Sequence, residues 1–181
     1  MSGTARSVVL LRGVNLGKAN RVPMAEFRVL LERLGLSQVR TLLNSGNAVA
    51  TGPRRSTAAL AAAIQRALQE TLAVDVPVIV HTGEEFARIV ANNPIVPPAD
   101  AHARFLVAFV SEPAALDVLR ALEPLLSPGE QLHVSERAAY LHCTGGLLES
   151  RAASAALGAR GRGVTTRNWA TVLKLQAALA G

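Results

Sequence analysis

Apolar residues along the first half of the chain follow strand-like and helix-like spacings in turn. Ser7 to Leu11 is a continuous apolar run of the kind found in a central strand. Apolar residues from Met24 to Leu34 recur at helical spacing, with Pro23 at the start and Gly35 at the end. Further strands are predicted at 39–44, 48–51 and 76–81, and a second helix at 57–72. This β-α-β-β-α-β order is typical of a ferredoxin-like unit.

The second half also alternates strands and helices. A linking helix is predicted at 83–91, and the Pro-rich segment 93–101 after it is the predicted linker. Beyond the linker we expect strands at 105–110, 131–134 and 139–142, and helices at 114–126, 149–157 and 169–179. The sequence therefore predicts an α+β fold with a ferredoxin-like domain, residues 1–92, and a second, smaller α+β domain, residues 102–181, packed against it.

Two polar loops are expected to meet at one edge of the first sheet. The first two strands of a β-α-β-β-α-β unit run parallel because a crossover helix joins them, so their C-terminal ends share an edge. Strand one ends at Arg12, and strand two ends at Asn44. The side chains predicted to converge there are Arg12, Asn15, Lys18, Asn44, Ser45 and Asn47.

This set of side chains is rich in hydrogen-bond donors and suits an anionic or carbonyl-bearing ligand. It lacks the carboxylate that a general base or a Mg²⁺ site would normally use, so no catalytic residue and no metal ligand is assigned. A purely structural interpretation stays open, because Asn and Gly are common in turns for their tolerance of left-handed backbone.

The chain carries a formal net charge of +6 over 181 residues, and nearly all of its positive charge comes from arginine. Either a compositional bias or a polyanion-binding surface explains this charge. Three arginines before the last helix form a second candidate anion-binding face: Arg160, Arg162 and Arg167. Nucleic-acid binding is possible but disfavoured, because aromatic residues for base stacking make up only 3% of the chain.

Several common functional motifs are missing from the chain. The segment Gly13 to Ala19 resembles a P-loop but is one residue short between the glycines and lacks the Mg²⁺-binding hydroxyl. Cys143 is the only cysteine, and it is expected to be structural. No apolar run reaches the ~20 residues of a membrane span. We therefore expect a cytoplasmic protein without a cofactor or a membrane partner.

Collinear motifs along nearly the whole chain resemble domain-of-unknown-function family 1697. They are Leu11-Arg12-Gly13-Val14-Asn15, Pro23-Met24, Asn44-Ser45-Gly46-Asn47, Asp75-Val76-Pro77-Val78, Asn93-Pro94, Tyr140-Leu141-His142 and Thr165-Thr166-Arg167-Asn168-Trp169. The resemblance implies a small soluble, mostly bacterial α+β protein and no established reaction, substrate or cofactor. This chain departs from the family pattern at Lys18 and Ala19, and at Glu149, where the family tends to have a basic residue.

The residues favour a non-catalytic binding or regulatory module for a small anionic or nucleotide-like ligand. One alternative is a basic nucleic-acid-binding protein that uses the segment 151–167. A second alternative is an unrecognised enzyme on phosphorylated substrates, with Ser45 and His142 as the reactive residue types.

Overall fold

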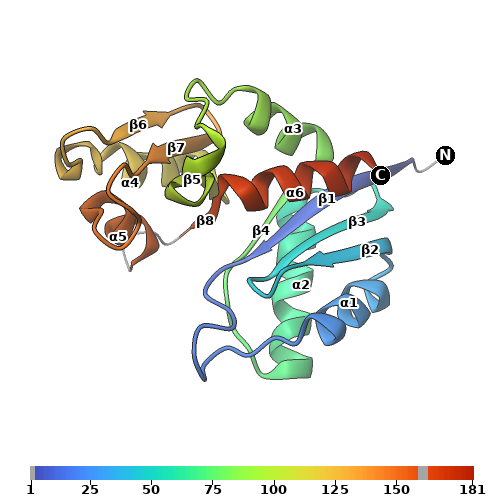
Figure 1. Ribbon diagram of the computed structural model, residues 1–181. Helices are drawn as coiled ribbons and strands as arrows, with labels where there is room; N and C mark the ends of the chain where they lie inside the picture. The colour runs from blue at the N-terminus through green and yellow to red at the C-terminus, as the bar shows by residue number, and fades with distance from the viewer. Residues whose placement is uncertain (1–2, 159–162) are drawn as a thin grey trace. The chain divides into compact units, whose positions relative to one another are not determined.

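The computed structural model describes residues 3–158 and 163–181. These residues contain two four-stranded antiparallel sheets with helices, which confirms the predicted α+β class (Figure 1). The chain divides into two units: the first runs up to Ala87 and includes Lys174–Gly181, and the second is Arg88–Leu173.

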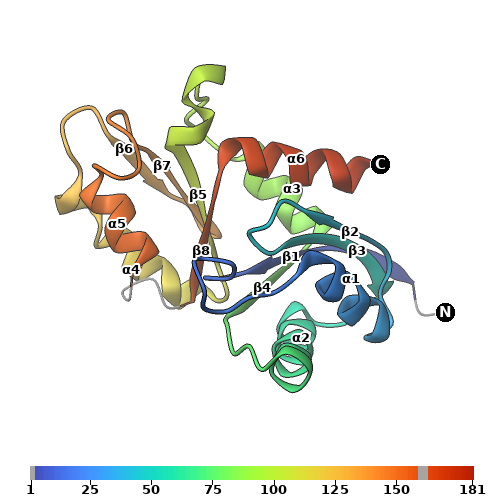
Figure 2. The same ribbon diagram turned by 60° about the horizontal axis from the view of Figure 1, so that its bottom comes forward.

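Sheet A, in the first unit, has the strand order β2-β3-β1-β4. Two helices, α1 and α2, cover one of its faces (Figure 2). Because β1 and β2 are both antiparallel to β3, they run in the same direction, as expected. The chain order is the predicted β-α-β-β-α-β, and the ferredoxin-like assignment itself stays a prediction. The elements are β1 (Thr4–Leu11), α1 (Met24–Arg33), β2 (Ser37–Leu42), β3 (Asn47–Pro53), α2 (Thr57–Leu72) and β4 (Val78–Thr82).

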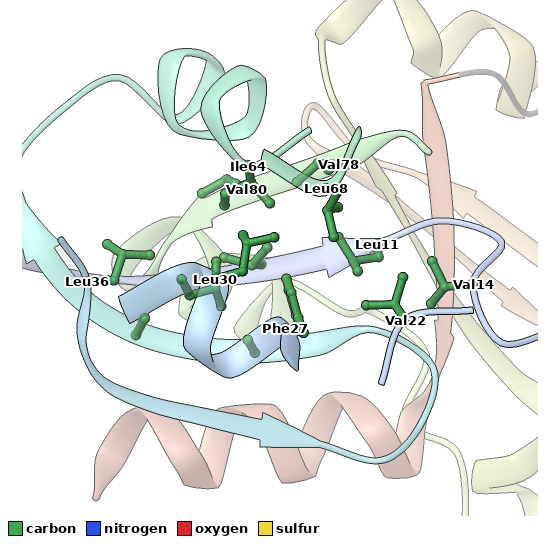
Figure 3. Packing of buried hydrophobic residues seen from close by; sticks show 14 of the residues in the cluster. Leu11, Val14, Val22, Phe27, Leu30, Leu36, Ile64, Leu68, Val78 and Val80 are labelled. Carbon is green, nitrogen blue, oxygen red and sulfur yellow. The ribbon is translucent and has the colours of Figure 1, made fainter. Parts of the chain in front are cut away.

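The core of the first unit lies between sheet A and its two helices. Phe27 on α1 and Ile64 on α2 are fully buried there with Leu11 of β1. Val14 and Val22, from the loop after β1, belong to the same cluster, and Figure 3 shows them at the Leu11 end of it. Both ends of that loop are therefore anchored in the core by apolar burial.

Sheet B, in the second unit, has the order β6-β7-β5-β8. Strand β8 was not predicted, because its polar sequence Thr-Thr-Arg-Asn hides the strand pattern, yet it pairs antiparallel with β5. The predicted helix 114–126 is only partly α-helical: α4 lies between two short 3₁₀ turns, and Pro124 falls in the second. The remaining elements of the chain are α3 (Gly83–Ala91), β5 (Phe105–Val110), α4 (Leu116–Arg120), β6 (Gln131–Val134), β7 (Ala138–His142), α5 (Arg151–Leu157), β8 (Val164–Asn168) and α6 (Trp169–Ala180). Both α3 and α6 have residues in each of the two units.

The division of the chain differs from the predicted domains 1–92 and 102–181. Residues 88–101 group with the second unit, and the C-terminal eight residues group with the first. The Arg6 guanidinium of β1 donates a hydrogen bond to the Leu179 carbonyl of α6, which joins the two ends of the chain within the first unit. Local composition carries no signal for such a long-range contact.

Candidate functional site

The two polar loops meet at the edge of sheet A where β1 and β2 end. The Leu11 backbone N–H donates to the Gly46 carbonyl at 2.8 Å, and the Asn15 side chain donates to the Asn44 carbonyl at 2.7 Å. We call this edge the rim and define it by residues 12–21 and 43–47. The structure thus brings together the two segments that the topology predicted would converge.

Asn15 holds the rim together. Its Nδ2 donates to the Val22 carbonyl at 2.9 Å as well as to Asn44, and its Oδ1 accepts from the Val22 N–H at 2.8 Å. Its backbone is left-handed, with φ 57°, a conformation that asparagine tolerates better than most residues. The side chain therefore positions the rim and is already occupied by backbone partners.

Asn47 is also part of the framework, because its side chain is fully buried. Its Nδ2 donates to the Leu42 carbonyl at 3.0 Å and to the Ser45 hydroxyl at 2.9 Å. The neighbouring Gly46 has φ 79°, and a Cβ added there would lie 2.6 Å from the Leu11 Cβ. The turn thus packs directly onto the end of β1, and Asn47 lies beneath the rim surface.

The charged groups of the rim lie nearer to solvent. Arg12 is half-buried, and Lys18 and Asn44 are exposed, as is Ser45. Arg21 is a further exposed cation that was not among the candidate residues, although its place in the loop could have indicated it. The sequence has no Asp or Glu in the segments 12–23 and 37–47.

The rim also has an apolar component that sequence reasoning missed. Leu16 is 73% exposed and Leu43 is 50% exposed. Leu16 directly follows Asn15 in the chain and Leu43 directly precedes Asn44, and these two asparagines are joined by a hydrogen bond. Leu43 has φ 57°, a strained conformation for leucine. In the sequence these leucines look like ordinary core residues, so no signal set them apart.

Arg167, from the second candidate face, lies in β8 and is buried. Its guanidinium donates to the Thr165 hydroxyl and to the Thr166 carbonyl, both at 2.8 Å. Burial lowers the pKa of Arg167 to about 10. This placement does not fit an exposed anion-binding face, because the Arg167 side chain is buried. Arg160 and Arg162 lie outside the described residues.

Cys143 is buried at the end of β7, in the core of the second unit. Burial raises the pKa of its thiol, and a hydrogen bond with Ser150 opposes that rise. A thiolate nucleophile needs a lowered pKa, so the environment of Cys143 acts in the opposite direction. The adjacent His142 ring lies 6.0 Å from the Phe105 ring, centroid to centroid.

Two further findings concern metals and membranes. No group of three His, Cys, Asp or Glu side chains that could hold a metal ion occurs in residues 3–158 and 163–181. Within the same part of the chain, no helix is long and apolar enough to cross a membrane.

Comparison with known proteins identifies a similar solved structure and a matching family model. A solved structure, that of the conserved bacterial protein SP0830 from Streptococcus pneumoniae, is similar with a TM-score of 0.75 and 25% sequence identity. The match covers 98% of this chain and 99% of that chain. No curated protein matches the chain. The family model described as "Protein of unknown function (DUF1697)" matches residues 4–140, which include the whole rim. The chain therefore belongs to the DUF1697 family of proteins of unknown function.

Proposed function

We propose that the protein is a non-catalytic binding or regulatory module whose rim binds a small anionic or nucleotide-like ligand. The observation that carries this proposal is the charge of the rim. Arg12, Lys18 and Arg21 lie in one loop, and neither this loop nor the segment 37–47 contains a carboxylate. Three cations in a loop that itself contains no acidic residue give this loop a net positive charge, which attracts anions.

The backbone of the rim supports the same proposal. Gly13 and Gly17 have positive φ values of 66° and 69°, and a Cβ added at either position would meet nothing within 4 Å. The backbone is therefore open on this side, and main-chain N–H groups in such turns can approach an anion closely. Asn15 fixes the loop against Asn44 before any ligand arrives, so less conformational entropy is lost on binding.

The candidate residues then have two roles. In this proposal Arg12 and Lys18 supply charge, and Asn44 and Ser45 supply polar contacts, whereas Asn15 and Asn47 position the loops. We also propose a cytoplasmic location, which the buried free thiol of Cys143 fits.

The test is isothermal titration calorimetry of the full chain with two ligands, AMP and inorganic phosphate. We expect AMP to bind, and we expect the double variant Arg12→Gln, Lys18→Gln to lose about tenfold or more in affinity, because charge-assisted contacts contribute about 1.5–3 kcal/mol each. Arg66→Gln, on exposed α2 surface, is the charge-matched control and should bind as the wild type does. Equal affinity of the double variant and the control, or no binding of either probe, would show that the rim is not the site.

One observation favours nucleic-acid binding as a second candidate. Of the 19 basic and 13 acidic residues of the chain, eleven basic and six acidic residues fall in the first unit, which leaves eight and seven in the second. The net positive charge is thus concentrated in the first unit, which favours a surface there over the segment 151–167 of the second unit. Binding of a labelled oligonucleotide should weaken steeply as salt increases if phosphates are the target. Absence of binding at low salt would remove this candidate.

A further inference from the structure

A cavity of about 510 Å³ lies at the edge of sheet A opposite the rim. It is formed where β1 begins and where β3 and β4 end, together with the start of α3 and the end of α6. All of its lining residues belong to the first unit: Ala5, Arg6, Arg54, Thr82, Gly83, Glu84, Ala87, Gln176, Leu179 and Ala180. A smaller cavity of about 150 Å³ shares Ala5, Arg54 and Thr82 with it. We propose that the larger cavity binds a small carboxylic acid with an aliphatic body.

The size and the apolar lining of the cavity fit a small organic molecule. Cavities that bind metabolite-sized ligands typically measure about 300–1,000 Å³, with mostly apolar walls and a few polar groups. Ala5, Ala87, Leu179 and Ala180 supply apolar wall here. At Gly83, an added Cβ would lie 3.4 Å from the Leu179 side chain, so the wall is already closely packed at that point.

Two arginines supply the positive charge of the cavity, and they have different tasks. The Arg6 guanidinium donates to the Leu179 carbonyl, which holds the α6 wall against β1. Arg54 is exposed, and among the described residues no hydrogen bond or ion pair involves its guanidinium. Arg54 is therefore the group that can pair with the carboxylate of a ligand, and arginine is well suited to two-pronged carboxylate recognition.

The start of α3 carries a capping box and one acidic side chain of the lining. The Thr82 hydroxyl accepts from the Glu85 N–H at 3.1 Å, and the Glu85 carboxylate accepts from the Thr82 N–H at 3.1 Å, so this capping box occupies two of the N–H groups at the helix start. Glu84 adds one carboxylate to the lining. A ligand with several negative charges would be repelled by Glu84, whereas a single carboxylate on an aliphatic body meets Arg54 and the apolar wall.

The experiment titrates the ¹⁵N-labelled full chain with hexanoate, and with hexan-1-ol as the uncharged match, and follows amide shifts by NMR. We expect hexanoate to shift the amides of Thr82, Gly83 and Leu179. Arg54→Gln should weaken hexanoate binding by about tenfold or more, because the free energy of a hydrogen bond to a charged group corresponds to a change in affinity of about that size. Glu84→Gln should strengthen hexanoate binding because it removes a repelling charge. Arg66→Gln is the control and should leave the affinity unchanged.

Three results would overturn the proposal. Hexan-1-ol could bind as tightly as hexanoate, Arg54→Gln could bind hexanoate as well as Arg66→Gln does, or the shifts could fall on Gly13 and Gly17 at the rim. Because Arg54 is exposed, its variant is expected to fold, and retained amide dispersion checks this. The rim proposal has its own probe and variants, so the two proposals fail independently.

Discussion

At the residue scale, the asparagines of the rim show how one side chain can tie two loops together. An amide carries donors and an acceptor, so Asn15 can bridge Val22 and Asn44 at once. Asn47 acts within one turn: from a fully buried position, where an unpaired amide would be costly, it donates to the Leu42 carbonyl and to the Ser45 hydroxyl. The hydrogen bonds of these two residues hold the rim in shape, and Lys18 and Arg21 are exposed beside them.

Two glycines of the rim are predicted to differ in their tolerance of a methyl group. Gly13→Ala should cost about 1 kcal/mol of unfolding free energy, because its φ of 66° is strained for alanine but the space is open. Gly46→Ala should cost about 3 kcal/mol or more, because it adds overlap with Leu11 and Val14, at 2.6 Å and 2.8 Å, to a similar strain. Urea unfolding of both variants measures the difference. Equal losses would mean that the turn moves away from β1 easily.

At the element scale, serine caps begin two of the helices. The Ser56 hydroxyl accepts from the Ala59 N–H at 3.0 Å at the start of α2, and the Ser150 hydroxyl accepts from the Ala153 N–H at 3.1 Å at the start of α5. The two caps are alike in geometry and unlike in surroundings, since Ser56 is exposed and Ser150 is buried. The burial of each hydroxyl determines how much stability is lost when that hydroxyl is removed.

Removal of the two caps should therefore have unequal effects. Ser56→Ala should cost about 1 kcal/mol, because water can replace the hydroxyl at the exposed helix end. Ser150→Ala should cost about 2 kcal/mol or more, because it leaves the Ala153 N–H buried without that partner and also removes the hydrogen bond to Cys143. Thermal unfolding with matched urea titrations reports both losses. A larger loss for Ser56→Ala would contradict the argument from burial.

At the scale of the whole molecule, the chain returns to its first unit at its end. Helix α6 begins in the second unit, and its last residues, from Lys174, belong to the first. Leu175 is fully buried, and the Leu179 carbonyl accepts the Arg6 hydrogen bond. The first unit is thus assembled from two stretches of chain that lie far apart in sequence.

Deletion of residues 174–181 should loosen sheet A. The loss of the buried Leu175 and of the Arg6 hydrogen bond predicts a stability loss of about 2 kcal/mol or more. Native-state hydrogen exchange at the β1 amides of Val8 and Leu10 would measure this loss. Deletion of 180–181 alone is the control and should change exchange little. Unchanged exchange after the longer deletion would show that the first unit is complete without α6.

Much of the fold could be predicted because it depends on local patterns. The bounds of α2, α3, β5 and β6 matched the predictions residue for residue, since periodic apolar spacing, a capping box and a solid apolar run each signal an element locally. The convergence of the rim loops also followed from the sequence, because a crossover helix forces β1 and β2 to run in the same direction. Strand β8 could not be predicted, because its polar residues become a strand only through pairing with β5.

The sequence by itself determined the α+β class, the order of elements in the first unit and the meeting of two polar loops at one edge of sheet A. Only the tertiary structure decided which polar residues of the rim are occupied inside the framework, that Arg167 is buried, and that the end of α6 joins β1. The physical reason is the distance along the sequence over which each kind of interaction acts. Helix and strand periodicity and capping act over a few residues, whereas burial and hydrogen-bond partners depend on contacts such as that between Arg6 and Leu179, which lie 173 positions apart.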